Sequence, residues 1–127
     1  MALIRGGSYR ITVTVKDKAT GTPIDLTPAL GILVGLYGDG RRIIGKWSLV
    51  DKSAEGYDAI FDYNASGEVT VLLNRSNSLT ALEKTARLEV VVVLPDVDFV
   101  DGAQYTIATD IVLDQVERSI FEGANAL

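Results

Sequence analysis

Alternation of apolar and polar side chains along short segments is the feature that most constrains this fold. Every second residue is apolar or glycine in residues 9–16, 42–49, 57–63 and 68–73. A period of two places successive side chains on opposite faces of a β-strand, so these segments predict half-buried strands. Residues 30–37 are apolar on both faces, and residues 86–94 alternate at first and then become apolar on both faces, which is typical of strands in the middle of a sheet. Residues 104–116 predict a long final strand.

Turn and helix signals separate these segments. Gly38-Asp39-Gly40 predicts a hairpin, because glycine adopts the positive φ that tight turns need. Residues 76–84 change period, and Ser78 or Thr80 can cap a helix of one or two turns there. About seven strands, one short helix and no repeating strand–helix–strand unit predict an all-β fold. We expect a single antiparallel β-sandwich domain over residues 1–127.

The expected core takes one face of each main strand. Trp47, the single tryptophan, is expected to anchor it, because aromatic rings bury large areas. Glycines inside the predicted strands, at positions 31, 35 and 45, either admit such a ring or receive a neighbouring subunit. The predicted core residues are Ile11, Val13, Leu30, Ile32, Val34, Trp47, Phe61, Val71, Leu88, Val90, Val92, Ile107, Ile111 and Leu113.

Composition excludes several kinds of chemistry. The chain has no cysteine and no histidine, which removes disulfides, thiolate nucleophiles, the commonest general base and the commonest metal ligand. A net charge of −5 without a basic stripe argues against binding to a phosphate backbone, and the apolar runs are too short to cross a bilayer. We therefore expect a protein that is not an enzyme, uses no cofactor and binds neither nucleic acid nor membrane.

Two sets of acidic residues are candidates for a chemical site. Asp96, Asp98 and Asp101 lie in one loop that ends in glycine, so they could bind a hard cation such as calcium. A solvated connection between strands is the alternative. Carboxylate pairs at strand spacing could support glycoside hydrolysis, although a solvated strand face is the commoner explanation. These pairs are Asp58 with Asp62 and Asp110 with Asp114.

Residues 5–29 combine an Arg-Gly-Gly lead, an alternating strand and a turn that contains proline. The positions of the turn pattern are Asp17, Gly21, Pro23, Ile24, Asp25, Leu26 and Thr27. This stretch resembles the opening of small bacteriophage virion proteins that begin with an immunoglobulin-like domain, as in the N-terminal domain of baseplate upper proteins. The resemblance implies an immunoglobulin-like β-sandwich, located in the virion, that docks a fibre, tail, baseplate or capsid component and has no catalytic residues.

Both ends of the chain carry apolar residues. We expect residues 1–7 and 117–127 to be docking tails, with an interface formed by Leu3, Ile4, Ile120, Phe121 and Leu127. The N-terminus lacks the features of a secretory signal, so assembly in the bacterial host cytoplasm is expected. Expected partners are other virion proteins and further copies of this chain. The alternative function is a carbohydrate-binding or adhesive sandwich, calcium-dependent through the acidic loop.

Overall fold

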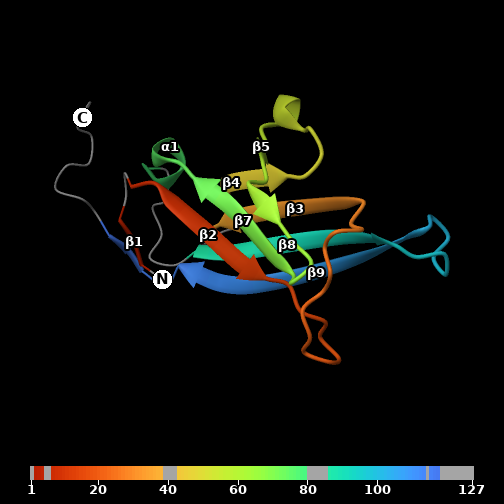
Figure 1. The fold of residues 1–127 in the computed structure, drawn as a ribbon. Helices are drawn as coiled ribbons and strands as arrows, with labels where there is room; N and C mark the ends of the chain where they lie inside the picture. The colour runs from red at the N-terminus through yellow and green to blue at the C-terminus, as the bar shows by residue number, and fades with distance from the viewer. Residues whose placement is uncertain (1, 5–6, 39–42, 80–85, 114, 118–127) are drawn as a thin grey trace.

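A computed structural model of the 127-residue chain describes residues 2–4, 7–38, 43–79, 86–113 and 115–117 (Figure 1). Side chains are described for most of these residues; for residues 2–4, 78–79, 108–113 and 115–117 the backbone alone is described. The described part of the chain is mostly β-strand, in two packed sheets. The predicted all-β sandwich is therefore confirmed.

The larger sheet has five strands. Across the sheet these are β5 (Asp58–Ala59), β4 (Ile43–Ser48), β3 (Gly31–Tyr37), β8 (Ala86–Pro95) and β9 (Ala103–Leu113). The pairs β4–β3, β3–β8 and β8–β9 are antiparallel, whereas β5 runs parallel to β4. The long hairpin of β8 and β9 extends well past the other strands at one end of the molecule (Figure 1).

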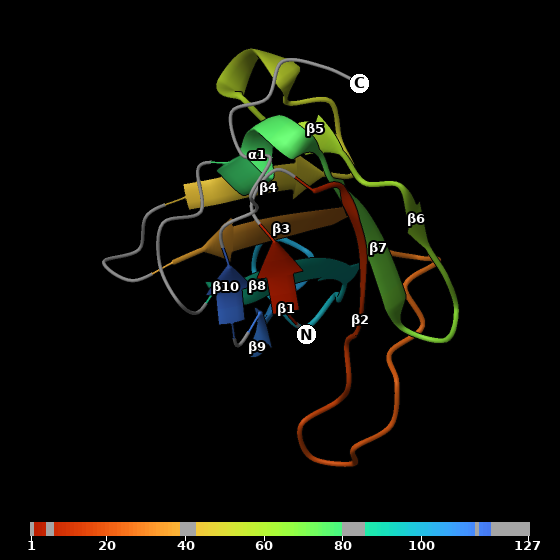
Figure 2. The same ribbon diagram turned by 90° about the vertical axis from the view of Figure 1, so that its left-hand side faces the viewer.

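The smaller sheet has three antiparallel strands, in the order β2 (Tyr9–Thr14), β7 (Glu68–Leu73) and β6 (Asp62–Tyr63). It stands beside the larger sheet in the end-on view of Figure 2. Two short strands, β1 (Ala2–Ile4) and β10 (Gln115–Glu117), pair in parallel at one end of the sandwich.

Helical structure in the described residues is confined to short pieces. The helix α1 (Arg75–Leu79) connects β7 of the smaller sheet to β8 of the larger one, as the change of period in residues 76–84 predicts. A single 3-10 turn, η2 (Ser53–Glu55), follows β4 and ends at Gly56, whose φ of 85° is a left-handed conformation that favours glycine. Residues 39–40 of the predicted hairpin lie outside the described part.

Trp47 occupies the centre of the core between the sheets. It is 1% exposed, and its Nε1 donates a hydrogen bond of 3.3 Å to the carbonyl oxygen of Leu72 in the smaller sheet. The register places Val34 opposite both Trp47 and Val90, so that strands β4, β3 and β8 direct these side chains inward together. The predicted core residues that are buried are Ile11, Ile32, Val34, Trp47, Val71, Leu88, Val90 and Val92, and partly buried Val13 packs against them.

Three predicted core residues are exposed, so these predictions are wrong. Leu30 lies just before β3. Its N–H bonds to the carbonyl oxygen of Val93, but its side chain is exposed. Ile107 faces outward, because β8 buries Val92 opposite Thr106 and so turns the neighbouring position to the other face. Ile111 and Leu113 have side chains outside the described part.

The third exposed residue, Phe61, reveals an error in a predicted strand. Residues 57–63 form two strands in different sheets, β5 and β6, instead of one. The N–H of Ile60 bonds to the carbonyl oxygen of Ser48 at 3.3 Å, and the next N–H, of Phe61, bonds to that of Thr70 at 3.0 Å. The chain therefore changes sheets between adjacent residues, which leaves the Phe61 ring at the border.

A register irregularity explains why Ile43 does not share the inward face of Trp47. Pairing between β3 and β4 shifts at Leu36, so that Gly45 faces Leu36 and Ile43 faces Tyr37. Ile44 is the extra residue of this bulge and is buried in place of Ile43, which is exposed.

Candidate functional site

The outer face of the larger sheet is apolar across its three longest strands. Leu33 of β3 lies opposite Val91 of β8, which lies opposite Ile107 of β9. In the next row Val93 lies opposite Tyr105. Tyr105 and Ile107 are 61% and 65% exposed, and the valines and Leu33 are partly exposed. A surface of this kind loses unfavourable contact with water when another protein covers it.

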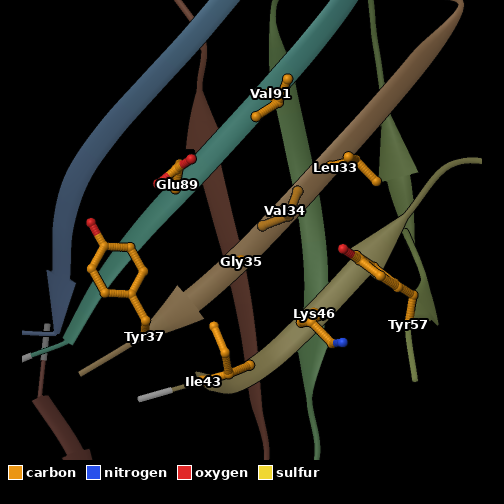
Figure 3. Close-up of a pocket in the computed structure, with 9 residues that line it drawn as sticks. All are labelled: Leu33, Val34, Gly35, Tyr37, Ile43, Lys46, Tyr57, Glu89 and Val91. Atoms are coloured by element: carbon orange, nitrogen blue, oxygen red, sulfur yellow. The ribbon is translucent and has the colours of Figure 1, made fainter. Parts of the chain in front are cut away.

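A shallow hollow of about 210 Å³ lies on this face at Gly35 (Figure 3). A Cβ atom at Gly35 would meet nothing within 4 Å, so this residue lies against open space in the hollow. Lys46 and Tyr57 lie on one side of it, and Glu89 and Tyr37 lie on the other (Figure 3). Lys46 and Glu89 are the residues opposite Gly35 in the two neighbouring strands.

The charged groups beside the hollow are held by their neighbours. The Lys46 ammonium donates a hydrogen bond of 3.0 Å to the carbonyl oxygen of Glu55 and lies 4.5 Å from the centre of the Tyr57 ring. Lys52 approaches the same ring at 5.7 Å. The hollow is smaller than the roughly 300–1,000 Å³ usual for small-molecule sites. This face is therefore better suited to contact with another protein surface.

The loop between β8 and β9 continues the apolar surface. Val97 and Val100 are fully exposed there, and Phe99 is about half exposed. The loop is nevertheless ordered by backbone hydrogen bonds, from Asp96 N–H to Gly102 carbonyl at 2.9 Å and from Gly102 N–H to Phe99 carbonyl at 2.9 Å. The loop that carries these exposed valines closes the β8–β9 hairpin, which protrudes beyond the other strands (Figure 1).

The predicted cation site at Asp96, Asp98 and Asp101 is not assembled in the structure. Asp96 Oδ1 accepts the Asp98 N–H at 3.0 Å, and Asp101 Oδ1 accepts the Ala103 N–H at 3.3 Å. These carboxylates close the turns of the loop instead of converging on one point. Throughout the described residues, no group of three His, Cys, Asp or Glu residues is placed to hold a metal ion.

The predicted carboxylate pairs also fail to form a site in the described part of the chain. Asp58 and Asp62 lie in strands of different sheets, because residues 57–63 change sheets. The side chain of Asp110 and all of Asp114 lie outside the described part. The prediction assumed that both members of each pair lie on one strand. Asp58 and Asp62 do not, because the chain changes sheets between them.

Two exposed carboxyl groups have a lowered pKa, and both serve turns. The pKa of Asp25 is lowered by hydrogen bonds from the Thr27 hydroxyl and N–H, at 2.7 and 2.9 Å. The pKa of Asp51 is lowered by hydrogen bonds from the Ser53 N–H and hydroxyl, at 3.1 and 2.9 Å. Both groups stay ionised to stabilise a loop, which is not the behaviour of a general acid.

The predicted interface residues fall at the limits of the described part. Leu3 and Ile4 belong to β1, where their backbone pairs with Val116 and Glu117 of β10 in the same chain. The N-terminal tail and the start of the C-terminal one are thus paired with each other. Ile120, Phe121 and Leu127 lie outside the described residues, so their predicted contact with a neighbour stays a prediction.

The three glycines of the predicted strands have different roles. At Gly45 a Cβ atom would come within 2.5 Å of the Trp47 ring, which confirms that this glycine admits the tryptophan. At Gly31 the nearest atom would be a Val93 methyl at 3.9 Å. Gly35 lines the hollow on the outer face and accommodates no core ring. The alternative explanation for strand glycines, contact with a neighbouring subunit, could therefore have pointed to this face from the sequence.

Comparison of the chain with protein-family models, curated proteins and solved structures finds no significant match. Helices in the described residues are all too short or too polar to cross a membrane. The function must therefore be inferred from the surface of the molecule itself.

Proposed function

We propose that this protein is a structural component of a bacteriophage virion that acts through protein–protein contacts. It would serve as a docking module for a fibre, the tail or baseplate, or the capsid. The observation that carries the proposal is the concentration of exposed apolar side chains on one outer sheet face and its protruding hairpin. Val97, Val100, Tyr105 and Ile107 are all highly exposed in this region. Large exposed apolar areas mark interaction sites more often than they mark free surface.

The strand order favours an immunoglobulin-like domain, which agrees with the resemblance of residues 5–29. In a variable-type immunoglobulin sandwich, strands A, B, E and D form one sheet, and G, F, C, C′ and C″ form the other. Strand A has no counterpart beside β2 in the described residues, because β1 pairs with β10. The order β2-β7-β6 and the order β9-β8-β3-β4-β5 have the same chain connections. The parallel pairing of β5 with β4 is a departure from an antiparallel sheet and affects the edge strand alone.

Features of the fold make an alternative carbohydrate-binding function less favourable. A sugar platform needs exposed aromatic rings, whereas Trp47 is buried and the Tyr57 ring lies beside two lysines. The guanidinium of Arg10 lies 4.8 Å from the centre of the Phe61 ring. Tyr105 remains as an exposed ring on the larger sheet, where its neighbours are aliphatic.

Sedimentation of virions from an infected culture tests the proposal. The chain should travel with purified particles in a density gradient, at a fixed copy number per particle. Replacing the hairpin valines together, Val97→Ser with Val100→Ser, should reduce its incorporation without lowering its thermal stability, because both side chains are fully exposed. Leu72→Ser, on the outer face of the smaller sheet, is the matched control and should be incorporated normally. A chain found wholly outside the particle fraction would contradict the proposal.

A further inference from the structure

Strand β9 ends the larger sheet with a long edge that has no partner strand within the described residues. It is eleven residues long, and it pairs with β8 on one side. The opposite end of that sheet is closed by β5, which has two residues, and the smaller sheet ends in β6, with two residues, and in β2, with six. Very short edge strands offer little backbone for another chain to pair with, whereas a long one offers a row of N–H and C=O groups.

The sequence of β9 lacks the usual protection of such an edge. Residues 103–113 contain no proline, glycine, lysine or arginine, and Asp110 is their single charge. Pairing with β8 runs without interruption from Ala103 to Ile111, with a register shift beyond that point. Proline, lysine and bulges are the devices by which proteins prevent strands from pairing at an edge. β9 is therefore an edge with continuous pairing on one side and little protection on the other.

The side chains of β9 are suited to pairing with a second copy of the same strand. Tyr105 and Ile107 project from the outer face on either side of Thr106. In an antiparallel pair centred on Thr106, each Tyr105 lies opposite the Ile107 of the other copy. Aromatic side chains opposite β-branched ones are among the favourable cross-strand pairs. A two-fold axis produces this contact twice.

We propose that two copies of the chain associate through antiparallel pairing of their β9 strands, with Thr106 opposite Thr106, so that the two larger sheets become continuous. This inference rests on the proposed assembly function and names its first partner and contact. The binding mode is the addition of a strand to a sheet edge, in which backbone hydrogen bonds supply much of the affinity.

The central threonine pair and the charges agree with this register. The molecule already contains such a cross-strand pair, in which the Thr12 and Thr70 hydroxyls hydrogen-bond at 2.8 Å. Centring on Thr106 sets Asp110 opposite Gly102 of the other copy. Centring on Asp110 would instead oppose two carboxylates, which is destabilising in a chain that already carries a net charge of −5. The Thr106 register thus sets each Tyr105 opposite an Ile107 and directly opposes no charges within residues 103–113.

Cysteine cross-linking tests this register, because the natural chain contains no cysteine. Directly opposed residues of antiparallel strands have Cα atoms about 4.5–5.5 Å apart, which a disulfide can span. Thr106→Cys should therefore form a covalent dimer under mild oxidation. Tyr105→Cys mixed with Ile107→Cys should yield the mixed dimer in preference to either symmetric one. Thr14→Cys, exposed on β2 of the smaller sheet, is the control and should stay mostly monomeric.

Light scattering on the purified chain gives a second measurement that needs no cysteine. The natural chain should approach twice its mass of 13.6 kDa as concentration rises. Ile107→Lys should weaken this association about tenfold or more, since it removes both apolar pairs and charges the edge. Thr14→Lys, the same added charge on the other sheet, should leave it unchanged. At concentrations where the natural chain is monomeric, both variants should unfold at its temperature, because both positions are exposed.

Two results would overturn the edge pairing. One is a mass of 13.6 kDa at every concentration. The other is cross-linking of Thr106→Cys that is no faster than that of Thr14→Cys. Either result leaves the virion assignment standing if the chain still sediments with particles. Conversely, a chain that dimerises through β9 but never enters particles would contradict the virion assignment and support the edge pairing.

Discussion

The outer faces of the two sheets differ in chemistry although both belong to one sandwich. On the smaller sheet, Arg10, Thr12 and Thr14 of β2 lie opposite Leu72, Thr70 and Glu68 of β7. On the larger sheet, the corresponding rows of β3, β8 and β9 carry the apolar set Leu33, Val91, Val93, Tyr105 and Ile107. Both faces are remote from the shared core, so core packing does not explain the difference.

The way each face treats its large side chains sharpens this contrast. On the smaller-sheet side, the Arg10 guanidinium lies 4.8 Å from the centre of the Phe61 ring, which remains about half exposed. Leu72 is flanked across the strand by the same arginine. On the larger sheet, Tyr105 and Ile107 have aliphatic neighbours and remain mostly exposed. The smaller sheet therefore places a charged group against its exposed apolar side chains, whereas the larger sheet surrounds Tyr105 and Ile107 with aliphatic ones, which favours contact with a protein partner.

The largest effect is expected where the two sheets meet. Trp47→Ala should reduce the free energy of unfolding by about 3–5 kcal/mol, because the ring is buried and its Nε1 donor reaches Leu72 across the sandwich. Urea denaturation measures the change. Phe61→Ala, which removes an exposed ring, is the control and should cost far less. Equal losses of unfolding free energy in the two variants would contradict the assignment of Trp47 to the core and of Phe61 to the surface.

The sequence predicts the strands better than their partners. Alternation located β2 and β7 and their buried faces, because burial of one face imposes the period of two, and apolar runs located β3 and β8. It placed Ile107 inward, because residues 104–113 alternate weakly between Thr, Ala and aliphatic residues, and the choice of face is made by Val90 and Val92 of the partner strand. The local sequence pattern of a strand does not determine its register with a distant strand.

The candidate surface was harder to predict than the core. Residues 96–102 were identified for their carboxylates, whereas that loop also exposes the apolar side chains of Val97, Phe99 and Val100. The carboxylates instead close turns on nearby N–H groups. Leu26 was missed from the core because Pro23 and Pro28 mark its segment as irregular, yet its side chain is fully buried. Depth of burial depends on where a loop lies against the sheets, which sequence spacing does not specify.

Two glycines provide a matched comparison of the inner and outer faces of the larger sheet. Gly45→Ala should lower the free energy of unfolding by about 1–3 kcal/mol, since its Cβ would overlap the buried Trp47 ring. Gly35→Ala should raise it by about 0.4–1 kcal/mol, because the new methyl meets nothing and the unfolded chain loses freedom. Thermal or urea unfolding of both variants gives the two signs. A loss of stability in Gly35→Ala would mean that the added methyl group meets other atoms, and so that the space at Gly35 is not open.

A smaller effect should separate the polar face from the apolar one. The Arg10 guanidinium and Phe61 ring should be coupled by about 0.5–1 kcal/mol in a double-mutant cycle of Arg10→Ala and Phe61→Ala. Their coupling is favourable because the cation lies over the face of the ring. Urea unfolding of the four chains measures it. Arg10→Ala with Tyr105→Ala, two residues in different sheets, is the control cycle and should show no coupling.

The smallest expected effect is electrostatic and concerns the turn that carries Leu26 into the core. Asp25 Oδ1 accepts hydrogen bonds from the Thr27 hydroxyl and N–H, which lower the pKa of Asp25 below its ordinary value of 3.8. A carboxyl group whose pKa is lower in the folded state contributes stability above pH 3.8, and that contribution is lost as the pH falls through the folded-state pKa. Asp25→Asn should therefore unfold at slightly lower urea than the natural chain at neutral pH, and this difference should vanish in acid.

An NMR titration of the Asp25 carboxyl should give a higher pKa in Thr27→Val, which lacks the hydroxyl donor, than in Thr27→Ser, which keeps it. Identical titrations in these two variants would mean that the hydroxyl does not hold the carboxylate, and that the turn positions Leu26 by its backbone alone.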